Sequence, residues 1–143
     1  SETDLLNRHA GAMAAAIGRG RAVVELGSGS STKTPLLLDA IDPAAYVPVD
    51  ISGDFLRDSA DILAARFPGL AIYPVEADFT QRVALPREID ALPKLGFVPG
   101  STIGNMVART AVDLLRNWRC ALGDGSLLLI GIAVRLGLGE WVR

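Results

Sequence analysis

The chain has 143 residues, half of them hydrophobic, and a formal net charge of −2, which predicts a single domain over residues 1–143 with enough apolar side chains for a buried core. The arginines are scattered rather than clustered, which argues against nucleic-acid binding, and no apolar run approaches the ~20 residues of a membrane span. The single cysteine, Cys120, excludes an intramolecular disulfide and favours a cytoplasmic location, and the single histidine, His9, cannot form a zinc site, so no metal is expected.

Helices and strands are predicted to alternate along the chain. Apolar residues at helical spacing and typical boundary residues indicate helices, whereas short runs of β-branched residues indicate strands. In chain order the predicted elements are a helix over 3–17, a strand over 23–26, a helix over 35–41, a strand over 46–49, a helix over 54–67, strands over 71–76 and 96–98, a helix over 106–122 and a strand over 126–134. Residues 80–94 are expected to form a loop with one helical turn, and Cys120 is expected to be buried in the last helix.

This alternation predicts an α/β fold. Right-handed crossovers between parallel strands give a Rossmann-like, doubly wound parallel sheet with the strand order 3-2-1-4-5. The last strand, SLLLIGIAV, is nearly all apolar, as is typical of a parallel strand covered on both faces. In such sheets, ligands bind at the carboxyl ends of the strands, where the strand order reverses. The candidate binding residues are therefore those that end or directly follow the strands.

The segment RAVVELGSGSSTK, residues 21–33, gives the first functional signal. Glu25 lies near the end of the first predicted strand, Gly27 and Gly29 form a turn, and hydroxyl residues and Lys33 precede a helix. Glycine accepts positive φ and, without a Cβ, lets the backbone approach a ligand closely. Free N–H groups and the helix dipole favour negative charge at the start of the helix. The segment therefore predicts a cofactor-binding turn, in which Lys33 is either a ligand residue or solvated.

Polar residues also follow the next three predicted strands. Asp50 comes 23 residues after Gly27, a spacing at which an acid accepts hydrogen bonds from the ribose hydroxyls of NAD or of S-adenosylmethionine. Asp78 can accept a hydrogen bond from an adenine amino group, while the backbone N–H at the aromatic Phe79 bonds the ring. Asn105 follows the fourth strand. Alternatively, Asp50 and Asp78 are helix or turn caps, and Asn105 is the N-cap of the last helix.

Three features favour S-adenosylmethionine over a dinucleotide. The glycine fingerprint of dinucleotide-binding folds, G-x-G-x-x-G, is broken because Thr32 stands at its third glycine. Asp78 supplies an acid for adenine at the end of the third strand. Glu25 suits the methyl donor, because the zwitterionic amino-acid end of that donor needs charge balance rather than a pyrophosphate cradle. A nicotinamide or other nucleotide ligand, and a structural or inactive domain, stay open as alternatives.

Four segments in this order and spacing, ELGSGSSTKTPLLLDA, YVPVDIS, VEADFT and FVPGSTIGN, resemble the histidine Nα-methyltransferase family of ergothioneine biosynthesis. The resemblance runs from about Val24 to Ile132. It implies a class I methyltransferase fold, incomplete at its C-terminal edge. It also implies S-adenosylmethionine as the cofactor and trimethylation of the α-amino group of L-histidine as the reaction.

The same resemblance implies roles for individual residues. The glycine turn and Lys33 would hold the donor, Asp50 would bind the ribose, and Asp78 with Phe79 would bind the adenine. Asn105, the asparagine of GSTIGN, would hold the amino-acid substrate. No general base can be assigned, so no catalytic residue is predicted.

Members of this family are longer and carry a second domain that binds the substrate, so the resemblance implies that this chain lacks the substrate domain. The final residues, IAVRLGLGEWVR, depart from the family pattern. Methylation of L-histidine by this chain alone is therefore not expected at a useful rate. The alternatives are a cofactor-binding remnant or partner subunit without turnover, and methylation of another small amine. Because the last strand would be an apolar sheet edge, a homodimer is also expected.

Overall fold

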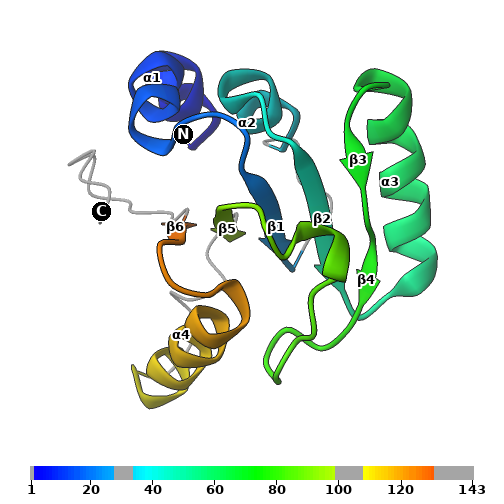
Figure 1. Cartoon of the computed structure of the whole chain (residues 1–143), viewed down its shortest axis with the longest axis vertical. Helices are drawn as coiled ribbons and strands as arrows, with labels where there is room; N and C mark the ends of the chain where they lie inside the picture. Colours follow the sequence, from blue (N-terminus) through cyan, green and yellow to red (C-terminus); the bar gives the residue numbers. More distant parts are fainter. Residues whose placement is uncertain (1, 28–33, 99–107, 131–143) are drawn as a thin grey trace.

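The computed structural model describes residues 2–27, 34–98 and 108–130 (Figure 1). The helices in these ranges are α1 (Glu2–Ile17), α2 (Thr34–Ile41), α3 (Gly53–Arg66), the short 3-10 helix η1 (Arg87–Ile89) and α4 (Ala108–Leu122). The strands are β1 (Ala22–Leu26), β2 (Ala45–Asp50), β3 (Ala71–Ile72), β4 (Val75–Glu76), β5 (Lys94–Val98) and β6 (Leu127–Ile130). Each lies where the sequence predicted an element of its type, and η1 is the helical turn expected in the loop.

The strands form one parallel sheet in the order β3-β2-β1-β5-β6, and β4 pairs with β2 after β3. When β3 and β4 are counted as the two parts of the third predicted strand, this is the predicted order 3-2-1-4-5. In Figure 1, α1 and α2 lie on one side of the sheet and α4 on the other. The predicted α/β, doubly wound architecture is confirmed.

The third predicted strand is divided into β3 and β4, although its register on β2 is continuous. Tyr73 and Ala77 each donate a backbone hydrogen bond of 2.9 Å, to the carbonyls of Tyr46 and Asp50 respectively. Between these two acceptors lies Pro48, which faces the same neighbour because bonding directions alternate along a strand. Proline has no N–H to donate, so one bond of this ladder is missing. The division of the strand thus originates in β2.

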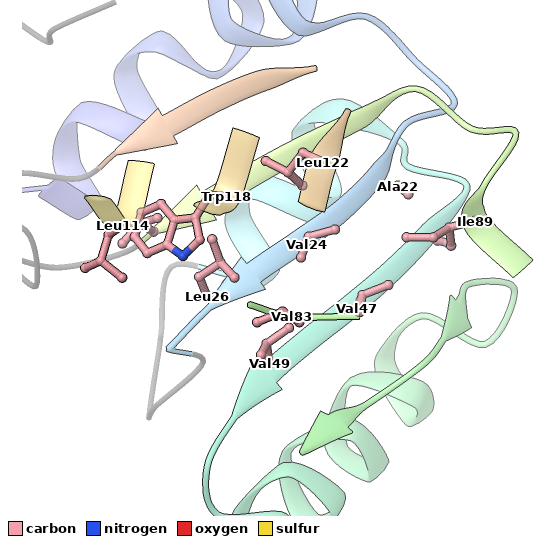
Figure 2. Packing of buried hydrophobic residues seen from close by; sticks show 12 residues of the cluster. Ala22, Val24, Leu26, Val47, Val49, Val83, Ile89, Leu114, Trp118 and Leu122 are labelled. Atoms are coloured by element: carbon pink, nitrogen blue, oxygen red, sulfur yellow. The ribbon is translucent and has the colours of Figure 1, made fainter. Parts of the chain in front are cut away.

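Two hydrophobic clusters cover the two faces of the sheet. One contains Val24 of β1, Val47 and Val49 of β2, and the buried face of α4 (Figure 2). The other contains alternate residues of the same strands, such as Val23 and Tyr46, together with side chains of α1, α2 and α3. Successive side chains of a strand point to opposite faces, so a nearly all-apolar strand requires cover on both sides.

The helix α4 presents Leu114, Trp118 and Leu122 to the sheet. Cys120, however, is exposed, so the expectation that it is buried was wrong. It follows Trp118 by two residues and therefore points roughly 200° away around the helix. The predicted helix positions 106–107 and strand positions 131–134 lie outside the described residues.

Candidate functional site

Backbone hydrogen bonds join the ends of β1, β2 and β4 into one rim. The N–H of Gly27 donates to the carbonyl of Val49 at 3.0 Å, and the N–H of Ala77 donates to the carbonyl of Asp50 at 2.9 Å. Asp78 follows Ala77 directly in the sequence. Gly27, Asp50 and Asp78 are thereby placed at the carboxyl ends of neighbouring strands, where the strand order led us to expect them.

Gly27 forms the first part of the turn after β1, with a φ of +73°. A Cβ at this position would lie 3.2 Å from Cε1 of Phe79, so the phenyl ring lies directly against the turn. The left-handed backbone and the close ring both favour glycine over every other residue here. The turn after β1 and the segment after β4 are therefore in direct contact.

Asp50 and Asp78 share one local geometry. Oδ1 of Asp50 accepts a hydrogen bond from the N–H of Ser52 at 3.2 Å, and Oδ1 of Asp78 accepts one from the N–H of Thr80 at 2.9 Å. The hydroxyl of Thr80 donates to the same Asp78 oxygen at 2.6 Å. These bonds lower the pKa of Asp78, so its exposed carboxylate is ionised at neutral pH and can only accept hydrogen bonds.

Glu25 has a very different environment, since its side chain is completely buried in β1. Its Oε1 accepts two hydrogen bonds of 2.6 Å, from the hydroxyls of Thr34 and Tyr46. Thr34 is the first residue of α2, and Tyr46 lies in β2. The carboxyl group therefore ties β1 to the start of the helix that follows the glycine turn. The sequence predicted a helix from residue 35, one residue after Thr34, but gave no indication of these two partners.

Burial raises the pKa of Glu25 from 4.5 to about 7. The two hydroxyl groups oppose this shift, and the negative charge of Asp50 adds to it. The second carboxyl oxygen, Oε2, is buried and has no hydrogen-bond partner in the described part of the chain. Burial and the Glu25 carboxylate in turn raise the pKa of Tyr46. At neutral pH, Glu25 is thus present in both its protonated and its ionised form.

Trp118, which is buried in the hydrophobic core, also contacts this rim. Its indole Nε1 donates a hydrogen bond of 3.0 Å to the carbonyl of Phe79. The two ring centroids are 6.0 Å apart, with an angle of 39° between the planes. The residues are 39 positions apart and belong to different elements, so no local signal in the sequence could have indicated the contact.

Three of the predicted site residues, Gly29, Lys33 and Asn105, lie outside the described residues. Within residues 2–27, 34–98 and 108–130, no group of three or more His, Cys, Asp or Glu side chains is placed to hold a metal ion. In the same ranges, no helix is long and apolar enough to cross a membrane.

The model of the histidine-specific, SAM-dependent methyltransferase family matches residues 1–136, which is nearly the whole chain. The chain belongs to this family. S-adenosylmethionine is the cofactor of the family, as the sequence analysis expected. The rim just described contains Gly27 with its positive φ after β1, the ionised Asp78 after β4, and Asp50 at the end of β2.

Two curated relatives are similar to this family member. Histidine N-alpha-methyltransferase of Mycolicibacterium smegmatis is 31% identical over 147 residues, which cover 100% of this chain and 45% of that protein. Histidine N-alpha-methyltransferase of Mycobacterium tuberculosis is 31% identical over 136 residues, which cover 92% of this chain and 41% of that protein. This member of the methyltransferase family therefore spans less than half the length of the relatives it matches.

The fold comparison agrees with the family. The structure of the mitomycin 7-O-methyltransferase MmcR matches with a TM-score of 0.61 at 18% identity, over 86% of this chain and 34% of that one. At this identity the likeness shows the fold alone, which is that of the class I methyltransferases. The fold class expected from the sequence is confirmed.

Proposed function

We propose that residues 1–143 form the cofactor-binding domain of an N-methyltransferase that uses S-adenosylmethionine and acts on histidine or a similar small amine. The observation that carries the proposal is the rim, where backbone bonds of 3.0 and 2.9 Å hold Gly27, Asp50 and the segment before Asp78 together. The family match over residues 1–136 and the names of the two mycobacterial relatives support the reaction and the substrate class.

The exposed Asp78 and the half-buried Asp50 have separate roles in this proposal. Asp50 accepts hydrogen bonds from the ribose hydroxyls. Asp78 accepts one from the adenine amino group, and the N–H of Phe79 donates to the adenine ring. The geometry supports this assignment, because both bonds from Thr80 go to Oδ1 of Asp78 and leave Oδ2 without a partner among the described residues. An ionised carboxylate cannot donate, so it suits an amino group.

The amino-acid end of the cofactor would lie at the turn after β1. Gly27 would let the backbone approach it, and the sequence proposes Gly29 and Lys33, which lie outside the described residues, as further contacts of this end. Glu25 contributes from β1, because its bond to Thr34 fixes the start of α2. A single buried carboxyl thus holds the strand before the turn and the helix after it.

Bound S-adenosylmethionine would supply an electrophilic methyl group on its sulfonium sulfur. The residues of this chain would hold the donor in one orientation and keep water away, which is the main contribution a protein makes to an in-line methyl transfer. Asn105 would orient the amine of the substrate. None of the side chains described at the rim is assigned as a general base.

Two further features belong to the same proposal. A cytoplasmic location is supported by the single cysteine in the sequence, because exported domains of this size commonly carry disulfides. A homodimer is supported by the position of the apolar strand β6 at the end of the described sheet.

Isothermal titration calorimetry with S-adenosylhomocysteine and with NAD tests the cofactor. We expect S-adenosylhomocysteine to bind and NAD to give no measurable heat; tight binding of NAD with no binding of S-adenosylhomocysteine would contradict the proposal. Replacing Asp50 by Ala should weaken binding by roughly 1.5–3 kcal/mol, as for a hydrogen bond to a charged group. An unchanged affinity in Asp50→Ala would mean that Asp50 only supports the start of α3.

A further inference from the structure

Trp118 of α4 contacts the loop that follows β4, far from it in sequence. Its indole N–H donates to the carbonyl of Phe79 at 3.0 Å, and the two rings are 6.0 Å apart. The Trp118 side chain is only 2% exposed. Figure 2 shows it on the same side of the sheet as Leu114 and Leu122, above the end of β1.

Phe79 is enclosed from two directions. The glycine turn lies against its ring, since a Cβ on Gly27 would be 3.2 Å from it, and Trp118 binds its backbone carbonyl. The side-chain bonds of Asp78 are local, reaching Thr80 two residues on, so they do not fix the loop relative to the sheet. Together with the bond from Ala77 to β2, the contact with Trp118 therefore sets where the loop lies.

We propose that Trp118 is a positioning residue for the adenine end of the cofactor. By holding the Phe79 carbonyl and ring against the glycine turn, it directs the Phe79 N–H and the Asp78 carboxylate toward the adenine edge. This inference rests on the proposed function, in which Asp78 and Phe79 recognise adenine. Under this proposal, α4 covers the sheet and also takes part in recognition of the adenine base.

If Trp118 only stabilised the fold, its replacement would have a different effect on ligand binding. Buried tryptophans commonly find an acceptor for their N–H, and losing that bond lowers stability wherever the residue lies. Such a loss would affect all ligands of the rim alike. A positioning role instead affects the discrimination between adenine and a base that lacks the 6-amino group. The ratio of two affinities therefore separates the roles, because overall stability cancels from it.

The experiment compares wild type with Trp118→Phe by calorimetry, using S-adenosylhomocysteine and its 6-deaminated analogue, S-inosylhomocysteine. The phenyl ring keeps an apolar body in the core and removes the N–H. We expect S-adenosylhomocysteine to bind about threefold to tenfold more weakly, as for one lost hydrogen bond, and the preference over the analogue to fall by a similar factor. A Trp118→Phe protein with the wild-type preference would overturn the inference.

Leu122→Val is the matched control. Leu122 lies one turn further along the same buried face, and its Cδ1 contacts Gly96 of β5 rather than the Phe79 loop. This variant should lose thermal stability and keep the wild-type preference for adenine. If its preference falls as far as that of Trp118→Phe, the effect is one of general packing and the inference is wrong. If wild type itself binds no S-adenosylhomocysteine, the proposed function fails, and this inference fails with it.

A second variant covers the case in which Trp118→Phe does not fold. In a Trp141→Phe background, tryptophan can be replaced biosynthetically by β-(3-benzothienyl)alanine, so that only position 118 carries the analogue. The analogue has the shape of indole with sulfur in place of the N–H. The same fall in adenine preference is expected, and an unchanged preference would contradict the positioning role.

Discussion

Three acids lie at or near the ends of neighbouring strands: Glu25, Asp50 and Asp78. They differ in burial, and burial determines the charge state and the contacts that each can have. Asp78 is exposed and its pKa is lowered, so it is a fixed negative acceptor at the surface of the rim. Asp50 is half-buried and bonds the backbone of Ser52. Glu25 is 0% exposed and has a pKa of about 7, so its charge depends on pH in the physiological range. In the proposed function, Glu25 therefore acts on the cofactor only through the residues that it holds, Thr34 and Tyr46.

The raised pKa of Glu25 predicts a pH-dependent stability. Because the folded-state pKa is about 7 and the value in the unfolded chain is near 4.5, the folded state holds a proton that the unfolded state has lost between these values. The free energy of unfolding should therefore fall as pH rises through this window, by about 3 kcal/mol in total, and the contribution should level off above it. Among the described residues, the charged and titratable groups that act on this carboxyl are Tyr46 and Asp50.

Glu25→Gln removes this titration and so provides the test. Urea unfolding at several pH values between 4.5 and 8 should show the Gln variant gaining stability relative to wild type as pH rises. Thr34→Val keeps the carboxyl group and removes one bond that favours its ionised form, so its pH dependence should persist and extend to higher pH. A stability difference between wild type and Glu25→Gln that does not change with pH would show that Glu25 titrates as it does in the unfolded chain.

At the scale of elements, local signals predicted most of the fold. The start of α2 was predicted to within one residue, because Pro35 is accepted only in the first turn of a helix. What the sequence did not reveal depends on contacts between distant elements. The break between β3 and β4 comes from Pro48 in the neighbouring strand, and the part that Trp118 takes in the rim comes from the packing of α4 over Phe79. The candidate acids were predictable because they end strands, whereas the groups that hold them were not.

The contact between β5 and α4 gives a prediction at this scale. A Cβ on Gly96 would lie 2.7 Å from Cδ1 of Leu122 and 2.9 Å from Cδ1 of Leu128, so a side chain there requires these two buried or half-buried leucines to shift. Gly96→Ala should lower the free energy of unfolding by about 1–3 kcal/mol through overpacking, as measured by urea denaturation. Gly69→Ala, where a Cβ would meet no atom within 4 Å, should change it by less than about 0.5 kcal/mol.

A double variant tests the cause of this destabilisation. Adding Leu122→Val to Gly96→Ala removes atoms from the crowded side, so the pair should lose less stability than the two single losses added together. Strict additivity would indicate that the methyl group at position 96 is accommodated elsewhere and that α4 is not seated on this glycine.

At the scale of the whole molecule, the chain corresponds to 45% and 41% of the two mycobacterial relatives. We therefore expect the 143-residue polypeptide to bind S-adenosylhomocysteine without methylating L-histidine at a useful rate, since the resemblance implies a separate substrate-binding domain. Mass spectrometry of a reaction with S-adenosylmethionine and histidine is the measurement, with the Mycolicibacterium smegmatis enzyme as the positive control. Abundant mono-, di- or trimethylhistidine would contradict the expectation. Turnover of another amine in an acceptor screen would indicate a different substrate, and cofactor binding without any turnover would agree with the expectation.

The outer side of β6, away from β5, bears on how the molecule assembles. This strand is last in the sheet order, and among the described residues it pairs with β5 alone. Its sequence, LLLI, is entirely apolar, and Leu127 is 38% exposed. A hollow of about 400 Å³ lies beside it, between the end of α4 and the start of the strand. Native proteins seldom leave such an edge open, because its unpaired N–H and C=O groups are a template for another chain.

We therefore expect the 143-residue polypeptide to form a homodimer that covers this edge. The edge would be covered by β6 of the partner, by the residues that follow it, or by both. These following residues include Leu136, Leu138 and Trp141, which lie outside the described ones. A closed two-fold arrangement with a largely apolar interface is the expected form, because the surface concerned has the character of a domain core. Light scattering at several concentrations is the measurement. Ile130→Lys should dissociate the dimer or unfold the chain, and circular dichroism distinguishes these two outcomes. Ile132→Lys, at a position outside the described residues, should have the same effect. The control Arg87→Lys, at an exposed position, should do neither. A monomer at micromolar concentration would instead show that the chain covers its own edge.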